Sequence, residues 1–249
     1  MSATRETLAR RRRHLMELAE PDSVIIVPSA RERLRNGDSF YPFRQDSDFL
    51  YLTGFNEPDA VLVLVPGRGE GEQILFCRPR DPARERWDGP RLGLDGARAT
   101  LGVDDAFPVD DVDEILPGLM EDRDHIYYAL GRDPAFDRRV IGWRTRLRER
   151  KRNARSPEEF IALDHVLHEL RLIKASEELR CMRRAARISA AAHVRAMQRC
   201  RPGLGEPDLT AELMHQFVRN GCEPAYLPIV AGGRRSEEHT SELQSLLII

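Results

Sequence analysis

The chain has 249 residues, of which 41% are hydrophobic and 32% are charged, and its formal net charge is −2. This length accommodates one large domain or two smaller ones, and the balanced charge argues against nucleic acid as a partner. The sequence has no apolar run near the roughly 20 residues of a membrane helix, and its arginine-rich start lacks a signal-peptide core, so we expect no membrane partner. Four scattered cysteines without Cys-x-x-Cys spacing are typical of free thiols in a reducing compartment, and we expect a cytoplasmic protein.

The first predicted elements are a charged helix over Arg5–Leu18 and a short buried strand over Ser23–Val27. The helix contains a run of arginines, Arg10–Arg13. Because charged runs usually lie on a solvated helix face, we expect these arginines on the solvent side.

The next stretch is predicted to be rich in strands. Phe49–Thr53 and Ala60–Val65 read as strands on either side of a Gly-Phe-Asn-Glu-Pro turn. A polar cluster that includes Asp38, interleaved with aromatic residues, precedes the first of them and suits a surface that recognises something polar. The glycine-rich segment Gly67–Gly71 is predicted to form a hairpin loop, and a further strand is expected after it, over Gln73–Cys77.

From residue 101 onward, strands and helices are predicted to alternate. The expected elements are a strand at Leu101–Val103, a helix at Ile115–Met120, a strand at Ile126–Leu130 and a helix at Phe136–Lys151. The segment Ser156–Glu159 predicts a further helix start, because a capping serine precedes a proline and two acids. This alternation indicates an α/β fold, with a layered domain built on a mixed sheet.

A second group of helices follows. Ser176-Glu177-Glu178 starts a helix whose apolar positions recur at three- and four-residue spacing up to Pro202, and another helix is expected over Pro207–Asn220. These helices have apolar faces and no sheet of their own to cover. We therefore place a domain boundary near Leu172–Ala175, with one domain over 1–172 and the start of another over 173–233.

Two stretches resemble a known family. One runs from Tyr41 to Leu64 and includes Tyr-Pro-Phe-Arg-Gln and Tyr-Leu-Thr-Gly-Phe-Asn-Glu-Pro, and the other runs from His168 to Gly203. They resemble the Xaa-Pro aminopeptidases (aminopeptidase P) of the creatinase/prolidase superfamily, over about residues 5 to 233. The resemblance implies a creatinase-type N-terminal mixed-sheet α/β domain, followed by the first helices of a truncated α+β "pita-bread" catalytic domain.

The resemblance also implies a function, which is release of the N-terminal residue from peptides whose second residue is proline. The family uses two divalent ions, usually manganese, held by Asp, His and Glu ligands that all lie downstream of the position matching Gly233. None has a counterpart in this chain, so we expect no catalytic, cofactor-binding or metal-binding residue, no bound metal and no activity in these 249 residues.

The partners implied by the resemblance are proline-containing peptides and further copies of the chain, as a dimer or tetramer. In the family, the regions matching Asp38 and Trp87 reach across to the active site of a neighbouring subunit, and we expect substrate contacts there. Local packing is the alternative for Trp87, since tryptophan often serves as an anchor.

Three histidines are candidate metal ligands by residue type, namely His165, His168 and His193. The order His165-x-x-His168-Glu169 matches neither of the known zinc-binding helix patterns, so we expect packing or surface hydrogen bonds for both histidines. His193 falls on the apolar face of the long helix and is expected to be a hydrogen-bonded core residue.

The last residues have an unusual composition. The segment Arg235–Ser245 resembles a translation of a common short-read sequencing adapter. We therefore expect residues 234–249 not to belong to the fold.

Two other readings of the chain compete with the peptidase. A non-catalytic α/β module for oligomerisation or binding predicts a stop near residue 172, whereas amphipathic helices continue beyond it. A nuclease-like site of the ribonuclease H type would need acids clustered at adjacent strand ends, and Asp46, Asp48 and Asp59 lie in turn-like sequence instead.

Overall fold

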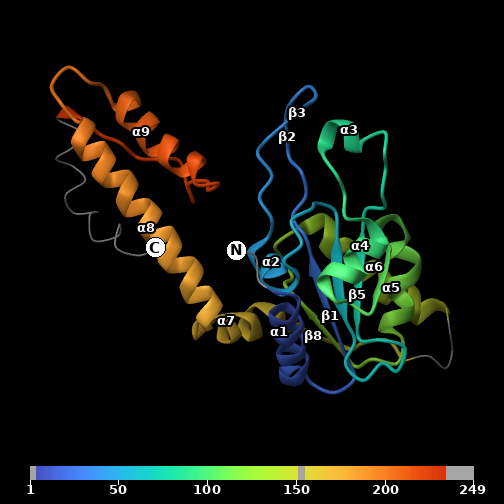
Figure 1. Cartoon of the computed structure of the whole chain (residues 1–249). Coiled ribbons are helices and arrows are strands. Elements are labelled where there is room, and N and C mark those ends of the chain that lie inside the picture. Colours follow the sequence, from blue (N-terminus) through green and yellow to red (C-terminus); the bar gives the residue numbers. More distant parts are fainter. Residues whose placement is uncertain (1–3, 151–154, 234–249) are drawn as a thin grey trace. The chain divides into compact units, whose positions relative to one another are not determined.

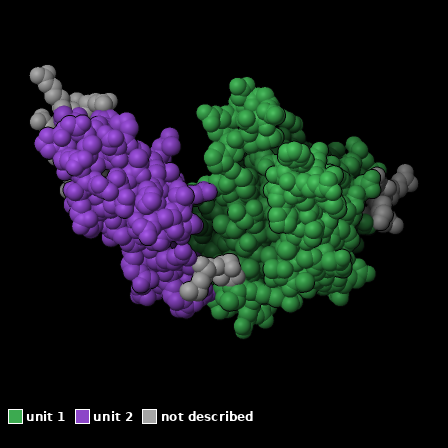
Figure 2. All heavy atoms as spheres, turned by 45° about the horizontal axis from the view of Figure 1, so that its top comes forward, with its two compact units in different colours: residues 1–173 green, residues 174–249 purple. Residues whose placement is uncertain are grey.

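The computed structural model describes residues 4–150 and 155–233. The chain divides into two compact units, residues 1–173 and residues 174–249 (Figure 2). The sequence placed the boundary near Leu172–Ala175. The adapter-like segment from residue 234 onward lies outside the described residues.

A six-stranded mixed sheet forms the centre of unit 1, in the order β6-β5-β4-β1-β7-β8. Strand β4 is antiparallel to both of its neighbours, and every other pair in the sheet is parallel. The strands are β1 (Ser23–Pro28), β4 (Val61–Leu64), β5 (Gln73–Cys77), β6 (Asp105–Pro108), β7 (His125–Tyr128) and β8 (Glu159–Ala162). The expected layered α/β domain with a mixed sheet is confirmed.

Helices cover both faces of this sheet (Figure 1). Alternate residues of β1 point to opposite faces, so that Ile25 and Val27 join one buried cluster while Val24 and Ile26 join the other. Side chains from four helices pack in the first cluster, and side chains from two helices pack in the second. The helices of the first cluster are α1 (Arg5–Leu18), α2 (Ser47–Thr53), α4 (Gly93–Leu101) and α7 (Leu163–Leu172). Those of the second cluster are α5 (Val112–Met120) and α6 (Pro134–Arg150).

The prediction of a strand at Phe49–Thr53 is wrong, because these residues form the end of helix α2. The side chain of Asp46 caps the helix by accepting hydrogen bonds from the amides of Asp48 and Phe49, both at 2.9 Å. At the other end, Gly54 adopts a φ of 65° and its amide bonds to the carbonyl of Leu50. The aromatic and β-branched residues of this segment favour a strand. The helix forms instead because Asp46 and Gly54 cap its two ends and because Phe49 and Leu52, three residues apart, are buried on one helix face.

Two further segment predictions are also wrong. Leu101 is the last residue of α4, and the strand in this region is β6, which begins at Asp105. The segment Ser156–Glu159 does not begin a helix, since Glu159 opens strand β8, which pairs in parallel with β7. Helix α7 begins only at Leu163. Pairing with a neighbouring strand overrides the local helix signal.

The expectation that Arg10–Arg13 lie on the solvent side is wrong for Arg12, whose side chain is fully buried. Its guanidinium donates to the carbonyl oxygens of Leu52, Leu101 and Gly102, at 2.9, 2.8 and 3.1 Å. It also donates to Oε1 of Gln73 at 2.5 Å. Arg12 thus caps the carboxyl ends of α2 and α4 together, where carbonyl groups have no partner within the helix.

Unit 2 contains the helices α8 (Ser176–Arg199) and α9 (Glu206–Arg219). Arg195 on α8 bonds to Glu212 on α9, and Arg199 lies 3.5 Å from the same carboxylate. His193 is exposed and bonds to the carbonyl of Ser189, so the expectation of a core histidine is wrong. Among the helices of the described residues, none combines the length and the apolar character needed to cross a membrane.

Candidate functional site

Two segments extend from the same edge of the sheet in unit 1. The hairpin of β2 (Leu34–Asn36) and β3 (Ser39–Phe40) follows the carboxyl end of β1, and helix α3 (Glu85–Asp88) follows the carboxyl end of β5. Because β1 and β5 are both antiparallel to β4, they run in the same direction and end at the same edge. Figure 1 shows the hairpin and the α3 loop projecting from that end of the unit. Loops at the carboxyl edge of such sheets are a common place for ligands.

The hairpin carries Asp38 at its turn, next to Gly37 with a φ of 55°. Asp38 is exposed. The amide of Tyr41 bonds to the carbonyl of Arg33 at 2.9 Å and closes the base of the hairpin. Large apolar side chains of this segment are more than half exposed, namely Leu34, Phe40 and Tyr41. Exposed apolar groups next to a carboxylate are typical of a contact surface.

The side chain of Trp87 on α3 is 90% exposed. The alternative of local packing for this residue is therefore wrong within unit 1. The loop around it is nevertheless well bonded. Glu85 accepts hydrogen bonds from Nε and Nη2 of Arg80, both at 2.7 Å, and from the amide of Asp81 at 2.9 Å. The side-chain bond with Arg80 lowers the pKa of the Glu85 carboxyl.

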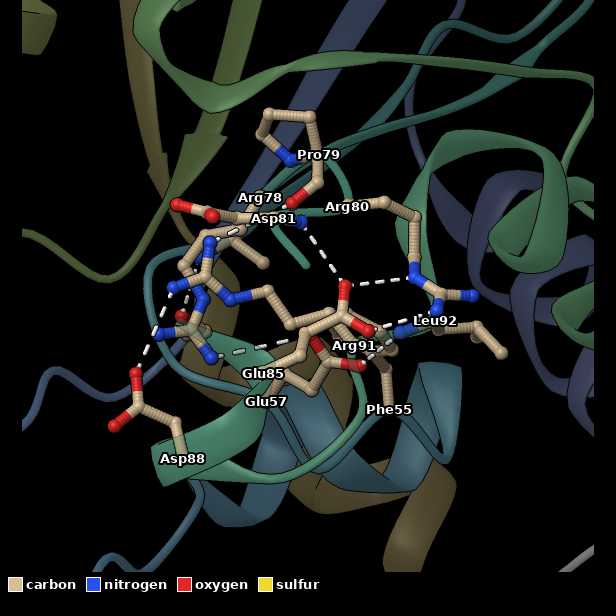
Figure 3. Close-up of polar contacts among 12 residues, drawn as sticks. Phe55, Glu57, Arg78, Pro79, Arg80, Asp81, Glu85, Asp88, Arg91 and Leu92 are labelled. Carbon is tan, nitrogen blue, oxygen red and sulfur yellow. Dashed lines mark hydrogen bonds and ion pairs between the residues drawn. The ribbon is translucent and has the colours of Figure 1, made fainter. Parts of the chain in front are cut away.

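The base of the same loop is held by Glu57, whose side chain Figure 3 shows between Leu92 and Arg78. Its Oε1 accepts a hydrogen bond from the amide of Leu92 at 2.7 Å, and its Oε2 lies 3.9 Å from Nη2 of Arg78. Arg91 donates to the carbonyl of Pro79 at 3.5 Å, across the base of the loop. Glu57 lies within the Tyr-Leu-Thr-Gly-Phe-Asn-Glu-Pro motif that carries the family resemblance, but the motif by itself does not connect it with the loop of Trp87. For Glu57 and Arg91 alike, only their place beside the loop in the fold reveals these contacts.

A cavity of about 840 Å³ opens in unit 1 near the carboxyl ends of β1 and β7 and the start of α7. Its lining includes aromatic and charged groups such as Tyr41, Arg44, Asp46 and Arg132. A cavity of this size lies in the range of small-molecule pockets, so it is a second place where unit 1 could bind a ligand.

One wall of the cavity is an ion-pair cluster around Asp48. The carboxylate of Asp48 is 7% exposed and bonds to Arg171 and, at 3.0 Å, to Arg132. Arg132 also pairs with Asp164 of α7. Burial by itself would lower the pKa of Arg132, but Asp48 and Asp164 raise it. These bonds connect α2, the loop after β7 and helix α7. We therefore interpret the cluster as a structural network that holds these elements together and not as a site of proton transfer.

No site for two divalent cations is present among the described residues, which contain no group of three or more His, Cys, Asp or Glu side chains placed to hold a metal. His165 and His168 are both exposed on α7. Hard divalent cations need several converging carboxylate oxygens. The described residues therefore do not fit the metal pair that the family resemblance implies.

Comparison with known proteins places these features in context. The family model for the aminopeptidase P N-terminal domain matches residues 8–127, and that for metallopeptidase family M24 matches residues 180–244. The chain is 42% identical over 233 residues to the Xaa-Pro aminopeptidase of Escherichia coli, covering 92% of this chain and 53% of that protein. The chain therefore spans about half the length of the curated relatives it matches.

Solved structures give the same picture. The Pseudomonas aeruginosa aminopeptidase PepP is 54% identical with a TM-score of 0.88, covering 90% of this chain and 51% of that one. A zinc-substituted E. coli aminopeptidase P in complex with product is 42% identical with a TM-score of 0.85, covering 89% of this chain and 51% of that one. At these identities the likeness extends beyond the fold to the family.

Proposed function

The chain belongs to the aminopeptidase P family, and from that premise we propose that it supplies the N-terminal half of a metal-dependent aminopeptidase. That enzyme would release the N-terminal residue from peptides in which proline follows. The observation that carries this proposal is the match to aminopeptidase P across both units, at 54% identity to a solved structure. The substrates are then proline-containing peptides. Four free cysteines among the described residues favour the cytoplasm as its location.

The catalytic metals need ligands other than the described residues, because these contain no suitable group. The family resemblance points to two manganese ions, whose chemistry is to lower the pKa of a bound water and to polarise the scissile carbonyl. We therefore expect no turnover from the 249 residues alone. The test is to express this polypeptide, supply manganese and assay an Xaa-Pro peptide. Turnover above that of a metal-only control would overturn this part of the proposal.

Asp38 and Trp87 are proposed to contact substrate at the active site of a neighbouring copy, in a dimer or tetramer. Support comes from their exposure and from the common edge of the sheet from which their segments project. A tryptophan that is 90% exposed on a bonded loop is a good candidate for an interface anchor. Sedimentation velocity over a range of concentrations tests the assembly. Trp87→Ala is expected to weaken self-association by about tenfold or more, and an unchanged profile would contradict this role.

The cavity beside Asp48 supports a second candidate, a non-catalytic α/β module for oligomerisation or binding. Expression of the gene in its own cells separates the two candidates. A product about twice the length of this chain with Xaa-Pro activity favours the peptidase. A stable 28.5 kDa product without activity favours the binding module.

A further inference from the structure

The loop that carries Trp87 is bridged at its base by the side chain of Glu57. It leaves the sheet after Arg78 and returns at Leu92, where α4 begins, and a single carboxylate contacts both ends. Oε1 of Glu57 accepts from the amide of Leu92 at 2.7 Å, and Oε2 lies 3.9 Å from Nη2 of Arg78. A carboxylate at the amino end of α4 also interacts favourably with the helix dipole. Glu57, which lies in the turn before β4, thus contacts both ends of the loop.

Arg91 adds a second connection across the base. Its side chain is 9% exposed, and it donates to the carbonyl of Pro79 while lying 3.8 Å from the carboxylate of Asp88. Figure 3 shows the guanidinium groups of Arg91 and Arg78 beside one another. Between Asp88 and Arg91 the chain turns at Gly89, whose φ of 87° is a conformation that favours glycine.

Some polar atoms of this cluster are buried without a hydrogen bond to any described residue. Oε2 of Glu57, Nε of Arg78 and Nε of Arg91 are buried atoms that form no hydrogen bond within the described part of the chain. Buried polar atoms without a bond are unfavourable for stability, so the geometry of this cluster calls for an explanation. The exposed indole of Trp87 lies on the loop that this cluster closes.

We propose that Glu57 is a positioning residue that fixes the loop of residues 79–92 and thereby presents Trp87 in one place to a second copy of the chain. An exposed anchor on a mobile loop would lose affinity, because the loop would have to be ordered when the copies meet. Fixing the loop beforehand removes that cost. The role of Trp87 rests on the proposed function, whereas the fixing of the loop does not.

The first experiment is amide hydrogen exchange on the full 249-residue chain, read by mass spectrometry. Glu57→Ala is expected to speed exchange in residues 85–92 by about tenfold, because the acceptor of the Leu92 amide is lost. Glu57→Gln keeps an acceptor oxygen and is expected to restore most of the protection. The control is Glu72→Ala, which removes the carboxylate that accepts from the amide of Gly67 at 2.7 Å in another loop. It should leave residues 85–92 unchanged.

Unchanged exchange in residues 85–92 of Glu57→Ala would overturn the proposal, and so would an equal increase throughout unit 1. The second experiment is sedimentation velocity on Glu57→Ala, Trp87→Ala and the double variant. The expected result is that both single variants weaken self-association and the double variant is no weaker than Trp87→Ala. Additive losses would show that Glu57 acts apart from Trp87 and would contradict the proposal.

The two experiments separate this inference from the proposed function. If Trp87→Ala leaves self-association unchanged, the proposed contact between copies fails. Hydrogen exchange still decides whether Glu57 fixes the loop. If Glu57→Ala does not fold, Glu57→Met takes its place in both experiments, because it removes the acceptor of the Leu92 amide and keeps most of the side-chain volume.

Discussion

Replacement of Arg12 by methionine is expected to destabilise unit 1 severely. The buried guanidinium donates to four acceptors, three of them carbonyls at the ends of α2 and α4. Methionine fills the volume of the arginine stem but leaves these acceptors without a donor. At about 1 kcal/mol for each, the lower end of the usual range, the expected loss in free energy of unfolding is about 3–5 kcal/mol. That is a large share of the stability of an ordinary domain.

The assay is urea denaturation followed by tryptophan fluorescence. Trp143 is fully buried and Trp87 is 90% exposed, so the change on unfolding comes mainly from Trp143 in unit 1. The matched control is Arg13→Met, one residue along the same helix, where the side chain is exposed and the change should stay within about 0.5 kcal/mol. Burial lowers the pKa of Arg12 to about 10, so it remains charged and the difference should be constant from pH 6 to 8. A loss below about 1 kcal/mol in Arg12→Met would refute the reasoning.

Two further predictions concern single side chains of unit 1. Asp48→Asn is expected to lower the free energy of unfolding by about 1–3 kcal/mol in urea denaturation, because it leaves Arg132 and Arg171 without their buried charged partner. The control is Asp95→Asn, at an ion pair whose carboxylate is 93% exposed, and it should lower the free energy of unfolding by less than about 0.5 kcal/mol. Equal losses in the two variants would contradict the role of Asp48. Cys77 is buried, and burial followed by the nearby Glu57 carboxylate raises the pKa of its thiol from 9.0 to about 12. A thiol reagent at pH 8 should therefore modify the other three thiols in the folded chain and Cys77 only in denaturant. The unfolded chain releases the Cys77 proton above pH 9 while the folded chain keeps it, so stability falls as the pH rises past 9. The decline should be shallower in Cys77→Ala, and an equal slope would contradict the assignment.

Regular patterns in the sequence were enough to locate many elements. The helix at Arg5–Leu18 and the strand at Gln73–Cys77 have the predicted bounds. The helix follows from apolar residues at helical spacing, of which Leu8 and Leu15 are buried, and the strand follows from a short apolar run after a hairpin loop, which is buried at every position. The long helix begins at Ser176 as predicted, and its first turn carries two acids at the positive end of the dipole.

The errors come from segments in which local preference and tertiary contacts disagree. Phe49–Thr53 has strand-like composition, but Asp46 and Gly54 end a helix around it. Ser156–Glu159 has a helix-start pattern, but β7 offers a strand partner. A partner strand is far away in the sequence, so no local pattern can report it.

The sequence by itself determined the fold class and the family. The fold class follows from periodicity and turn signals, which are local properties of the chain, whereas Asp38 and Trp87, the residues of the proposed contact, follow from the family resemblance. The tertiary structure alone decided that Arg12 is buried and that Glu57 accepts a hydrogen bond from Leu92 at the base of the Trp87 loop. Arg12 reaches acceptors 40 to 90 positions away, and Glu57 reaches Leu92 35 positions away. Whether a charged side chain is solvated or bonded depends on which distant backbone groups the fold brings to it, and that information is absent from any local stretch of sequence.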